Sequence, residues 1–183
     1  DRWSLGFVAE TEKQVERILA DLEKVVASAD EVSDKKLLVT RVAGPSLEQR
    51  DSHYVMRSRS NKVQALPAIV AKPIELQLPT ATNQWPRTLM VVTDEPGDVA
   101  LPQLLVMQQA TPRSQYLLWY NIRLMPGAKI PEVPSSENGV IPVDIKSLFL
   151  KLAPEDIAAA YGDVLNKGAS SLSQGLFDLS KDE

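Results

Sequence analysis

Hydrophobic residues recur at spacings of three and four in the first part of the chain, which is the period of an amphipathic α-helix. The recurrence is continuous after Thr11, which forms a capping-box pattern with Gln14 three residues later. The apolar positions that share one face are Val15, Ile18, Leu19, Leu22, Val25 and Val26. This spacing predicts a long helix that begins near Thr11 and buries one face.

Two shorter helices are expected next. The second begins at Ser33 or Asp34, because serine and aspartate cap helix N-termini, and it ends before Gly44. The third covers residues 45–59 and starts with Pro45. The inward positions of these two helices are expected to be Leu37, Leu38, Val42, Leu47, Tyr54 and Val55. The polar face of the third helix is expected to hold Glu48, Arg50, Asp51 and Arg57.

From about residue 73 the period of the pattern changes from 3.6 to 2. Apolar and polar residues alternate in a first stretch, and three further stretches are also candidates, so we expect four β-strands. The four stretches are residues 74–78, 88–93, 102–110 and 115–124. Their turn-rich separators are short, whereas a parallel crossover needs about a dozen residues or more. The pattern therefore favours an antiparallel meander.

The fourth of these stretches presents two different faces. The first face, expected in the core, carries Tyr116, Leu118, Tyr120, Ile122 and Leu124. The second face carries Gln115, Leu117, Trp119, Asn121 and Arg123. An aromatic ring beside an amide and a guanidinium suits either a solvent-facing sheet or the lining of a concave pocket.

A last helix is predicted over residues 154–167, with Pro154 and two acidic residues in its first turn. Its buried stripe is expected to be Ile157, Ala160, Tyr161, Val164 and Leu165. The fold class is therefore α+β, with N-terminal helices packed on a curved four-stranded antiparallel sheet and a C-terminal helix. We expect a linker or disordered N-terminus at residues 1–10, one domain at 11–168, and a tail at 169–183.

Composition removes several classes of function. The chain has 20 Lys and Arg against 24 Asp and Glu, a net charge of −4, so it lacks the broad cationic field that attracts nucleic acid. It has no cysteine and one histidine, which excludes thiolate zinc sites, iron–sulfur clusters and sites that need two imidazoles. No glycine-rich phosphate motif occurs. We expect no cofactor, no metal and no nucleic-acid partner.

Two local features are candidates for chemistry. His53 lies on the third predicted helix without a nucleophile or an orienting group in sequence reach, so we interpret it as structural. Trp85 opens the second strand ahead of Arg87. An indole in a loop is expected to pack back on the sheet, with Arg87 stacked on the ring, or else to contact a ligand. Apolar runs are far shorter than the roughly 18 residues of a membrane span, so any membrane contact is expected through a segment outside this chain.

Three segments carry a resemblance to a known group of proteins. Residues 38–50, 85–87 and 153–165 resemble an uncharacterised family of cell-envelope proteins, lipoproteins or single-pass membrane proteins, from high-GC Gram-positive bacteria. The resemblance implies an extracytoplasmic location, anchored or secreted, and makes the tail the entry into a second unit. It brings no catalytic residues. The order of helices and sheet is also similar to NTF2-like (cystatin-like) folds, which have a cavity at one end.

Three hypotheses for the function follow. The first is a non-enzymatic extracytoplasmic domain that binds a protein or a small molecule. The second is a small-molecule-binding NTF2-like domain, or a degenerate enzyme, with a cavity at the sheet face. The third is a structural spacer. The candidate ligand-binding residues are Trp119, Asn121, Arg123, Gln108, Trp85 and Arg87.

Overall fold

The computed structural model describes residues 12–72, 74–82, 84–94, 101–125, 128 and 140–177. The predicted linker at 1–10, the cap at Thr11 and the end of the tail lie outside these residues. The chain divides into two units, Asp1–Ile141 and Pro142–Glu183, and each is described by itself. The division falls inside the stretch 11–168 that the pattern assigns to one domain.

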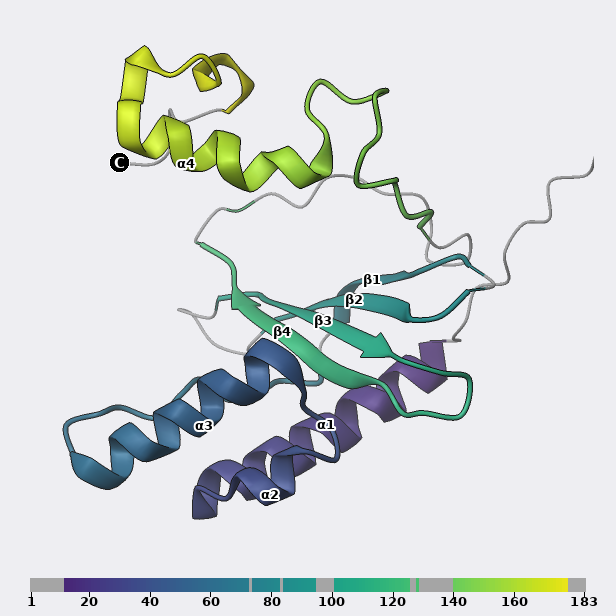
Figure 1. The fold of residues 1–183 in the computed structure, drawn as a ribbon. Coiled ribbons are helices and arrows are strands. Elements are labelled where there is room, and N and C mark those ends of the chain that lie inside the picture. Colours follow the sequence, from purple (N-terminus) through teal and green to yellow (C-terminus); the bar gives the residue numbers. More distant parts are fainter. Residues whose placement is uncertain are drawn as a thin grey trace, which may run out of the picture. The chain divides into compact units, whose positions relative to one another are not determined.

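The first unit opens with the three expected helices, α1 (Glu12–Val32), α2 (Lys35–Leu38) and α3 (Gly44–Arg59) (Figure 1). The predicted stripe of α1 is confirmed, since its buried residues are Val15, Leu19, Leu22, Val26 and Ala29. Asp34 caps α2 as predicted, by accepting a hydrogen bond from the backbone of Lys36. Helix α2 is shorter than expected and does not reach Gly44.

The early end of α2 has a physical cause in the backbone that follows it. The amide of Leu118 in the last strand donates to the carbonyl of Arg41 at 2.8 Å, and the amide of Ala43 donates to the carbonyl of Leu118 at 2.9 Å. Val42 thus forms a short parallel bridge with Leu118. Residues that pair with a strand edge cannot also remain in a helix, so pairing overrides the helical pattern.

The inward face of α3 differs from the prediction. Val55 and, on α2, Leu37 are exposed, whereas Arg50, expected in solvent, is buried. The buried residues of α3 are Ser46, Arg50, His53 and Tyr54. Arg50 can be buried because it forms an ion pair with Asp30 of α1.

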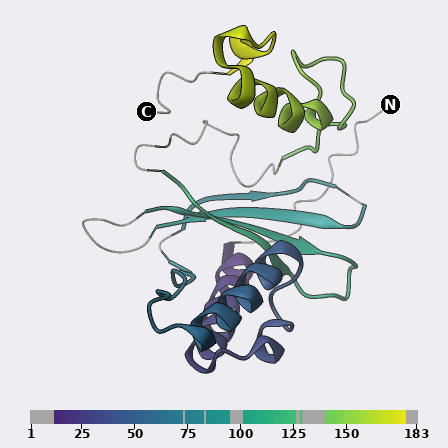
Figure 2. The same cartoon turned by 60° about the vertical axis from the view of Figure 1, so that its left-hand side comes forward.

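The four predicted strands are confirmed as β1 (Ile74–Pro79), β2 (Arg87–Thr93), β3 (Gln103–Gln109) and β4 (Leu117–Arg123). They form one antiparallel sheet in the order β1-β2-β3-β4, so the meander is also confirmed. Helices α1 to α3 cover one face of this sheet (Figures 1 and 2). The sheet is not strongly curled in either view, and the expected curvature is not confirmed.

Strand β4 contains an extra residue that changes its phase. Val106 of β3 pairs with Tyr120, but the next residue, Met107, pairs with Leu118. Trp119 therefore has no partner residue on β3, which is the arrangement of a β-bulge. From this point on, side chains of β4 point to the face opposite to the one that strict alternation predicts.

Because of the bulge, the predicted core face of the fourth strand is confirmed before Trp119 and wrong after it. Tyr116 and Leu118, which precede Trp119, are buried as expected. Tyr120 and Ile122, which follow it, are 46% and 45% exposed, so their placement in the core was wrong.

The core of the first unit lies between the helices and the covered face of the sheet. Burial of one such side chain stabilises the fold by about 1.5–3 kcal/mol. The buried members of this cluster are Val15, Leu19, Leu22, Val26, Ala29, Leu38, Val42, Tyr54, Ile69, Ala71, Leu89, Val91, Leu105, Met107, Tyr116 and Leu118.

The second unit contains the predicted C-terminal helix, α4 (Ile157–Lys167), which follows a 3₁₀ turn at Pro154–Asp156. Two further 3₁₀ turns follow, at Gly168–Ser170 and Gln174–Leu176. The predicted buried stripe of α4 is largely wrong, because Val164 is its buried residue while Ile157 and Leu165 are exposed.

Candidate functional site

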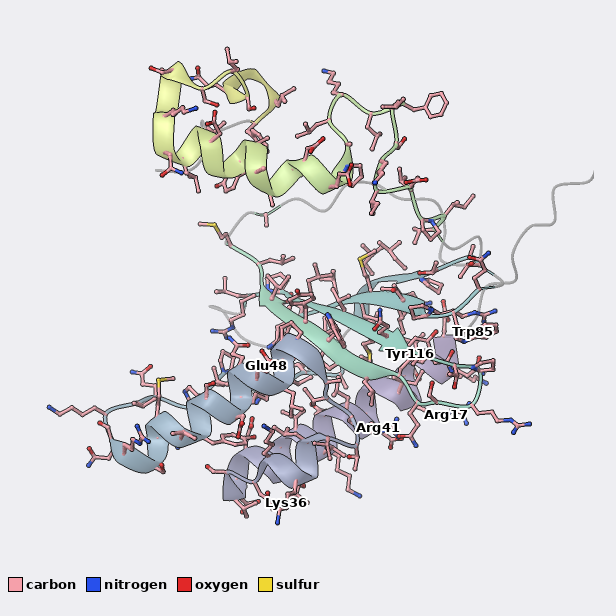
Figure 3. All side chains as sticks on the ribbon, viewed as in Figure 1. Arg17, Lys36, Arg41, Glu48, Trp85 and Tyr116 are labelled. Carbon is pink, nitrogen blue, oxygen red and sulfur yellow. The ribbon has the colours of Figure 1, made fainter. Side chains whose placement is uncertain are left out.

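Two cavities of the first unit lie along α1. The α1–α2 pocket has a volume of about 400 Å³ and is lined by Asp21, Lys24, Val25, Ser28, Lys36, Leu37, Thr40 and Arg41. The α1–turn pocket has a volume of about 350 Å³ and is lined by Gln14, Arg17, Ile18, Asp21, Arg41, Gln109, Ser114, Gln115 and Tyr116. The two pockets share Asp21 and Arg41, and we call them together the α1 groove. Arg17, Arg41 and Lys36 follow one another along α1 in Figure 3.

The periodicity of α1 explains which residues face the groove. One stripe of α1 supplies Asp21 and the residues three, four and seven positions after it, which are Lys24, Val25 and Ser28. This stripe lies beside the buried stripe that contains Leu22 and packs on the sheet. Elements from other parts of the chain supply the opposite wall.

The shared wall of the two pockets is an ion pair. Nη2 of Arg41 donates to a carboxylate oxygen of Asp21 at 2.7 Å, and the Arg41 side chain is 15% exposed against 60% for Asp21. Because the backbone of Arg41 is hydrogen-bonded to Leu118, the guanidinium is anchored to the sheet as well as to α1. Such double anchoring holds a binding group in place before any ligand arrives.

Hydrogen bonds fix the β3–β4 turn at the far end of the groove. The side-chain amide of Gln109 donates to the carbonyl of Ser114 at 3.0 Å. The Ser114 hydroxyl accepts from the amide of Thr111 at 2.7 Å. Tyr116 is buried directly after this turn. The α1–turn pocket thus has walls from ordered elements on both sides.

The groove carries positive charge on an acidic chain. Its four cationic side chains are Arg17, Lys24, Lys36 and Arg41, and they face the carboxylate of Asp21. Within the residues that the structure describes, Lys24 and Lys36 form no ion pair, whereas Lys35 and Lys72 pair with Asp51 and Glu16. Four cationic side chains against one carboxylate leave the groove with an excess of positive charge, which attracts anions.

The structure separates the sequence-predicted site residues of the sheet. The register places Asn121 and Arg123 opposite Leu105 and Gln103, on the face covered by helices. Gln108 follows the buried Met107 and points to the other face. Trp119 lies at the bulge against Gly44 at the start of α3. These residues do not form one wall, because the bulge divides them, and none of them lines the α1 groove.

The remaining two predicted residues form a stacked pair. The guanidinium of Arg87 lies 4.3 Å from the centre of the Trp85 ring, so the expected stacking is confirmed. The indole of Trp85 donates to the side-chain oxygen of Gln109 at 3.3 Å. Because Gln109 lines the α1–turn pocket, Trp85 reaches the groove through one intervening side chain.

The residues of the groove itself were missed by the sequence analysis. Arg17, Lys24, Lys36 and Arg41 come from two helices and a connection, and nothing in their spacing brings them together. One feature of the sequence could have indicated the groove, because Asp21 and Lys24 flank the apolar stripe of the long helix. Such flanking positions are normally solvated, however, and do not by themselves predict a site.

A buried polar cluster joins α1 to α3 outside the groove. The carboxylate of Asp30 accepts hydrogen bonds from the guanidinium of Arg50 and from the hydroxyl of Tyr54. Arg50 also donates to the carbonyl of Pro67 at 3.3 Å. Burial of Tyr54, and secondly its hydrogen bond to Asp30, raise the pKa of its phenol well above the usual range. His53, which precedes Tyr54 in sequence, is also buried.

Metal-ligand clusters and membrane-spanning helices are both absent from the described residues. No group of three or more His, Cys, Asp or Glu side chains in this part of the chain is placed to hold a metal ion. Among the helices that the structure describes, none combines the length and the apolar character of a membrane span.

The fold and the groove define an α+β protein of two units with a cationic surface groove on the first. The chain belongs to the family described as a domain of unknown function (DUF8094), which matches residues 8–183. The matched range includes all but the first seven residues of the first unit, the whole second unit and thus the entire tail 169–183 that sequence analysis set apart. No curated protein and no solved structure matches the chain.

Proposed function

We propose that this domain is a non-enzymatic binding module and that the α1 groove is its ligand site. The observation that carries the proposal is the pair of adjoining pockets that share the anchored Arg41–Asp21 ion pair. Volumes of about 400 and 350 Å³ lie within the range of about 300–1,000 Å³ of small-molecule sites. The fixed walls support binding, since little order is lost when a ligand enters.

The proposal is tested by NMR with a library of small fluorinated fragments, half of them neutral and half acidic. We expect ligand-induced shifts of backbone amides in residues 14–28, 36–41 and 109–116. Ser28→Trp fills the α1–α2 pocket with an indole and should abolish the shifts there. Ala27→Trp is the matched control, because Ala27 is exposed on the same helix and lines neither pocket. Shifts that spare the groove, or that survive equally in both variants, contradict the proposal.

A second candidate is a ligand cavity on the helix-facing side of the sheet, as in an NTF2-like domain. It is supported by the side-chain oxygens of Gln103 and Asn121, which are buried without a hydrogen-bond partner within the described residues. Buried polar atoms of this kind are normally satisfied by water or a ligand. In the same NMR experiment this candidate predicts shifts at residues 103–105 and 121–123 instead.

We also propose an extracytoplasmic location, supported by the resemblance of residues 38–50, 85–87 and 153–165 to cell-envelope proteins. Fractionation of cells that express the native protein tests the location. Recovery with the envelope or the medium is expected, and recovery in the cytosol alone contradicts it.

A further inference from the structure

The charged residues of the α1–α2 pocket converge from two directions. Lys24 and Ser28 lie one turn apart on the same face of α1. Lys36 comes from α2, and Arg41 comes from the connection between α2 and α3. Three cationic groups, two hydroxyls (Ser28 and Thr40) and the carboxylate of Asp21 therefore border one hollow of about 400 Å³.

These charges are not balanced by carboxylates of the described chain. Asp21 is the acidic residue of the pocket, and it is hydrogen-bonded to Nη2 of Arg41. Lys24 and Lys36 form no ion pair within the described residues. Like charges around one hollow repel each other, and a bound anion removes that repulsion.

The lining also has an apolar part. Val25 of α1 and Leu37 of α2 border the same pocket, and Leu37 is exposed although it is a large aliphatic residue. An exposed leucine beside unpaired lysines suits a ligand with a charged end and an apolar end. The ammonium groups and the Ser28 hydroxyl can donate hydrogen bonds to an anion, and the one carboxylate of the pocket, Asp21, is already paired with Arg41.

We propose that the α1–α2 pocket binds the phosphoryl group of an organic phosphate, with Lys24, Lys36 and Arg41 around the phosphoryl oxygens and Val25 and Leu37 against the apolar part. This inference rests on the proposed function, because it names the ligand class of the same groove. A phosphate monoester carries close to two negative charges at neutral pH, which two lysines without carboxylate partners can match. The phosphoryl group can belong to a soluble compound or to a lipid headgroup.

The test is titration of the full chain with phenyl phosphate at pH 7.5 and constant ionic strength, followed by NMR. Saturable shifts are expected in residues 21–28 and 36–41, and none with phenol, which lacks the phosphoryl group. Lys24→Gln and Lys36→Gln should each raise Kd about three- to tenfold, and the double variant should raise it further. Lys62→Gln removes the same charge from an exposed turn outside the groove and should change Kd less than about twofold. Thermal melts confirm that all variants are folded.

Three results would overturn the inference or the wider proposal. Equal weakening by Lys24→Gln, Lys36→Gln and Lys62→Gln would show attraction by overall charge alone, and the phosphoryl site would be wrong. Absence of phenyl phosphate binding, while neutral fragments still bind the groove, would refute the ligand class and leave the binding module standing. Absence of any compound in the groove would refute both.

A second arm identifies the source of the phosphoryl group. Sedimentation with vesicles of phosphatidylglycerol, compared with phosphatidylcholine, is measured for the unchanged chain and for the double variant Lys24→Gln/Lys36→Gln. Binding that requires phosphatidylglycerol, disappears in the double variant and is displaced by phenyl phosphate supports a lipid headgroup. Binding of phenyl phosphate without binding to either vesicle supports a soluble organic phosphate.

Discussion

At the scale of single residues, the extra residue Trp119 in β4 decides which of two tyrosines supports the core, Tyr116 just before the strand or Tyr120 within it. Tyr116 precedes this extra residue and is buried, whereas Tyr120 follows it and is 46% exposed. We expect Tyr116→Ala to lower the free energy of unfolding by about 3–5 kcal/mol and Tyr120→Ala by less than about 1 kcal/mol. Urea denaturation of the two variants measures the difference. Equal losses would mean that β4 keeps strict alternation.

Gly44 and Trp119 form a second residue-level contact. Gly44 has φ of +53°, and a Cβ atom at this position would lie 2.8 Å from the Trp119 ring. Gly44→Ala should therefore destabilise the fold in two ways, through backbone strain of about 1–3 kcal/mol and through displacement of the ring. In a Trp119→Ala background only the strain remains, so the same substitution should cost less.

A double-mutant cycle of Gly44→Ala and Trp119→Ala, measured by urea denaturation, tests this contact. Additive losses in unfolding free energy would contradict it. Trp119→Ala alone should cost about 1–2 kcal/mol, because the ring is 36% exposed and loses only part of its buried area.

The two faces of β4 could not be predicted correctly from the sequence. Residues 116–120 are all apolar or aromatic, so the residue types do not indicate a slip at Trp119. The slip becomes visible only when the partner residues Val106 and Met107 are known. Prediction of the strand was therefore correct, and prediction of its faces was correct only up to Leu118.

At the scale of elements, the Asp30 cluster holds α1 and α3 together. Asp30→Asn would leave the buried guanidinium of Arg50 without its counter-charge, which typically costs about 3–5 kcal/mol. Asp51→Asn is the matched control, because Asp51 pairs with Lys35 in an exposed setting that contributes about 1 kcal/mol or less. Chemical denaturation of both variants provides the comparison. A loss for Asp30→Asn no larger than for the control would show that the cluster is not a link between the helices.

The same cluster predicts a pH dependence. Burial and the hydrogen bond to Asp30 raise the pKa of Tyr54 in the folded protein, so the folded state holds the phenol proton more tightly than the unfolded state does. This contribution to stability is complete below the unfolded pKa of about 10, and it falls as the pH rises above that value. Thermal melts between pH 8 and about 11 should show a smaller loss of stability in Tyr54→Phe than in the unchanged chain. Identical slopes would contradict the assignment.

The elements themselves could be predicted because each has a clear period, and the four strands and the helices α1, α3 and α4 lie where the pattern placed them. The end of α2 could not, because it depends on bonds between Arg41, Ala43 and Leu118, which lie far apart in the sequence. The groove could not be predicted for the same reason, since it is formed by residues that lie far apart in the sequence. Its walls come from α1, α2 and the β3–β4 turn, and their approach follows from helix packing on the sheet rather than from any local motif.

At the scale of the whole molecule, total charge and local charge differ in sign. A net charge of −4 argues against broad attraction of polyanions, and that conclusion follows from composition alone. The cationic lining of the α1 groove is invisible to composition, because Lys24, Lys36 and Arg41 are outnumbered along the chain by acidic residues located elsewhere.

The two units differ in the size of their hydrophobic cores, and therefore in their expected stability. All buried members of the hydrophobic cluster belong to Asp1–Ile141. In Pro142–Glu183, Leu148, Phe149 and Leu172 are almost fully exposed. A chain of about 40 residues rarely sustains a core without disulfides or metals. An isolated helix as short as α4 is also marginal in water.

We therefore expect opposite behaviour from two fragments of the chain. Residues 1–141 should fold alone and melt cooperatively, with the helical and strand circular dichroism of the intact first unit. Residues 142–183 should be largely unfolded and show a gradual, non-cooperative change on heating, since the Tyr161–Phe177 ring contact and the Asp163–Lys167 ion pair are too weak to replace a core. A sharp melting transition of the 142–183 fragment, or a non-cooperative one of the 1–141 fragment, would contradict this assignment of stability to the first unit.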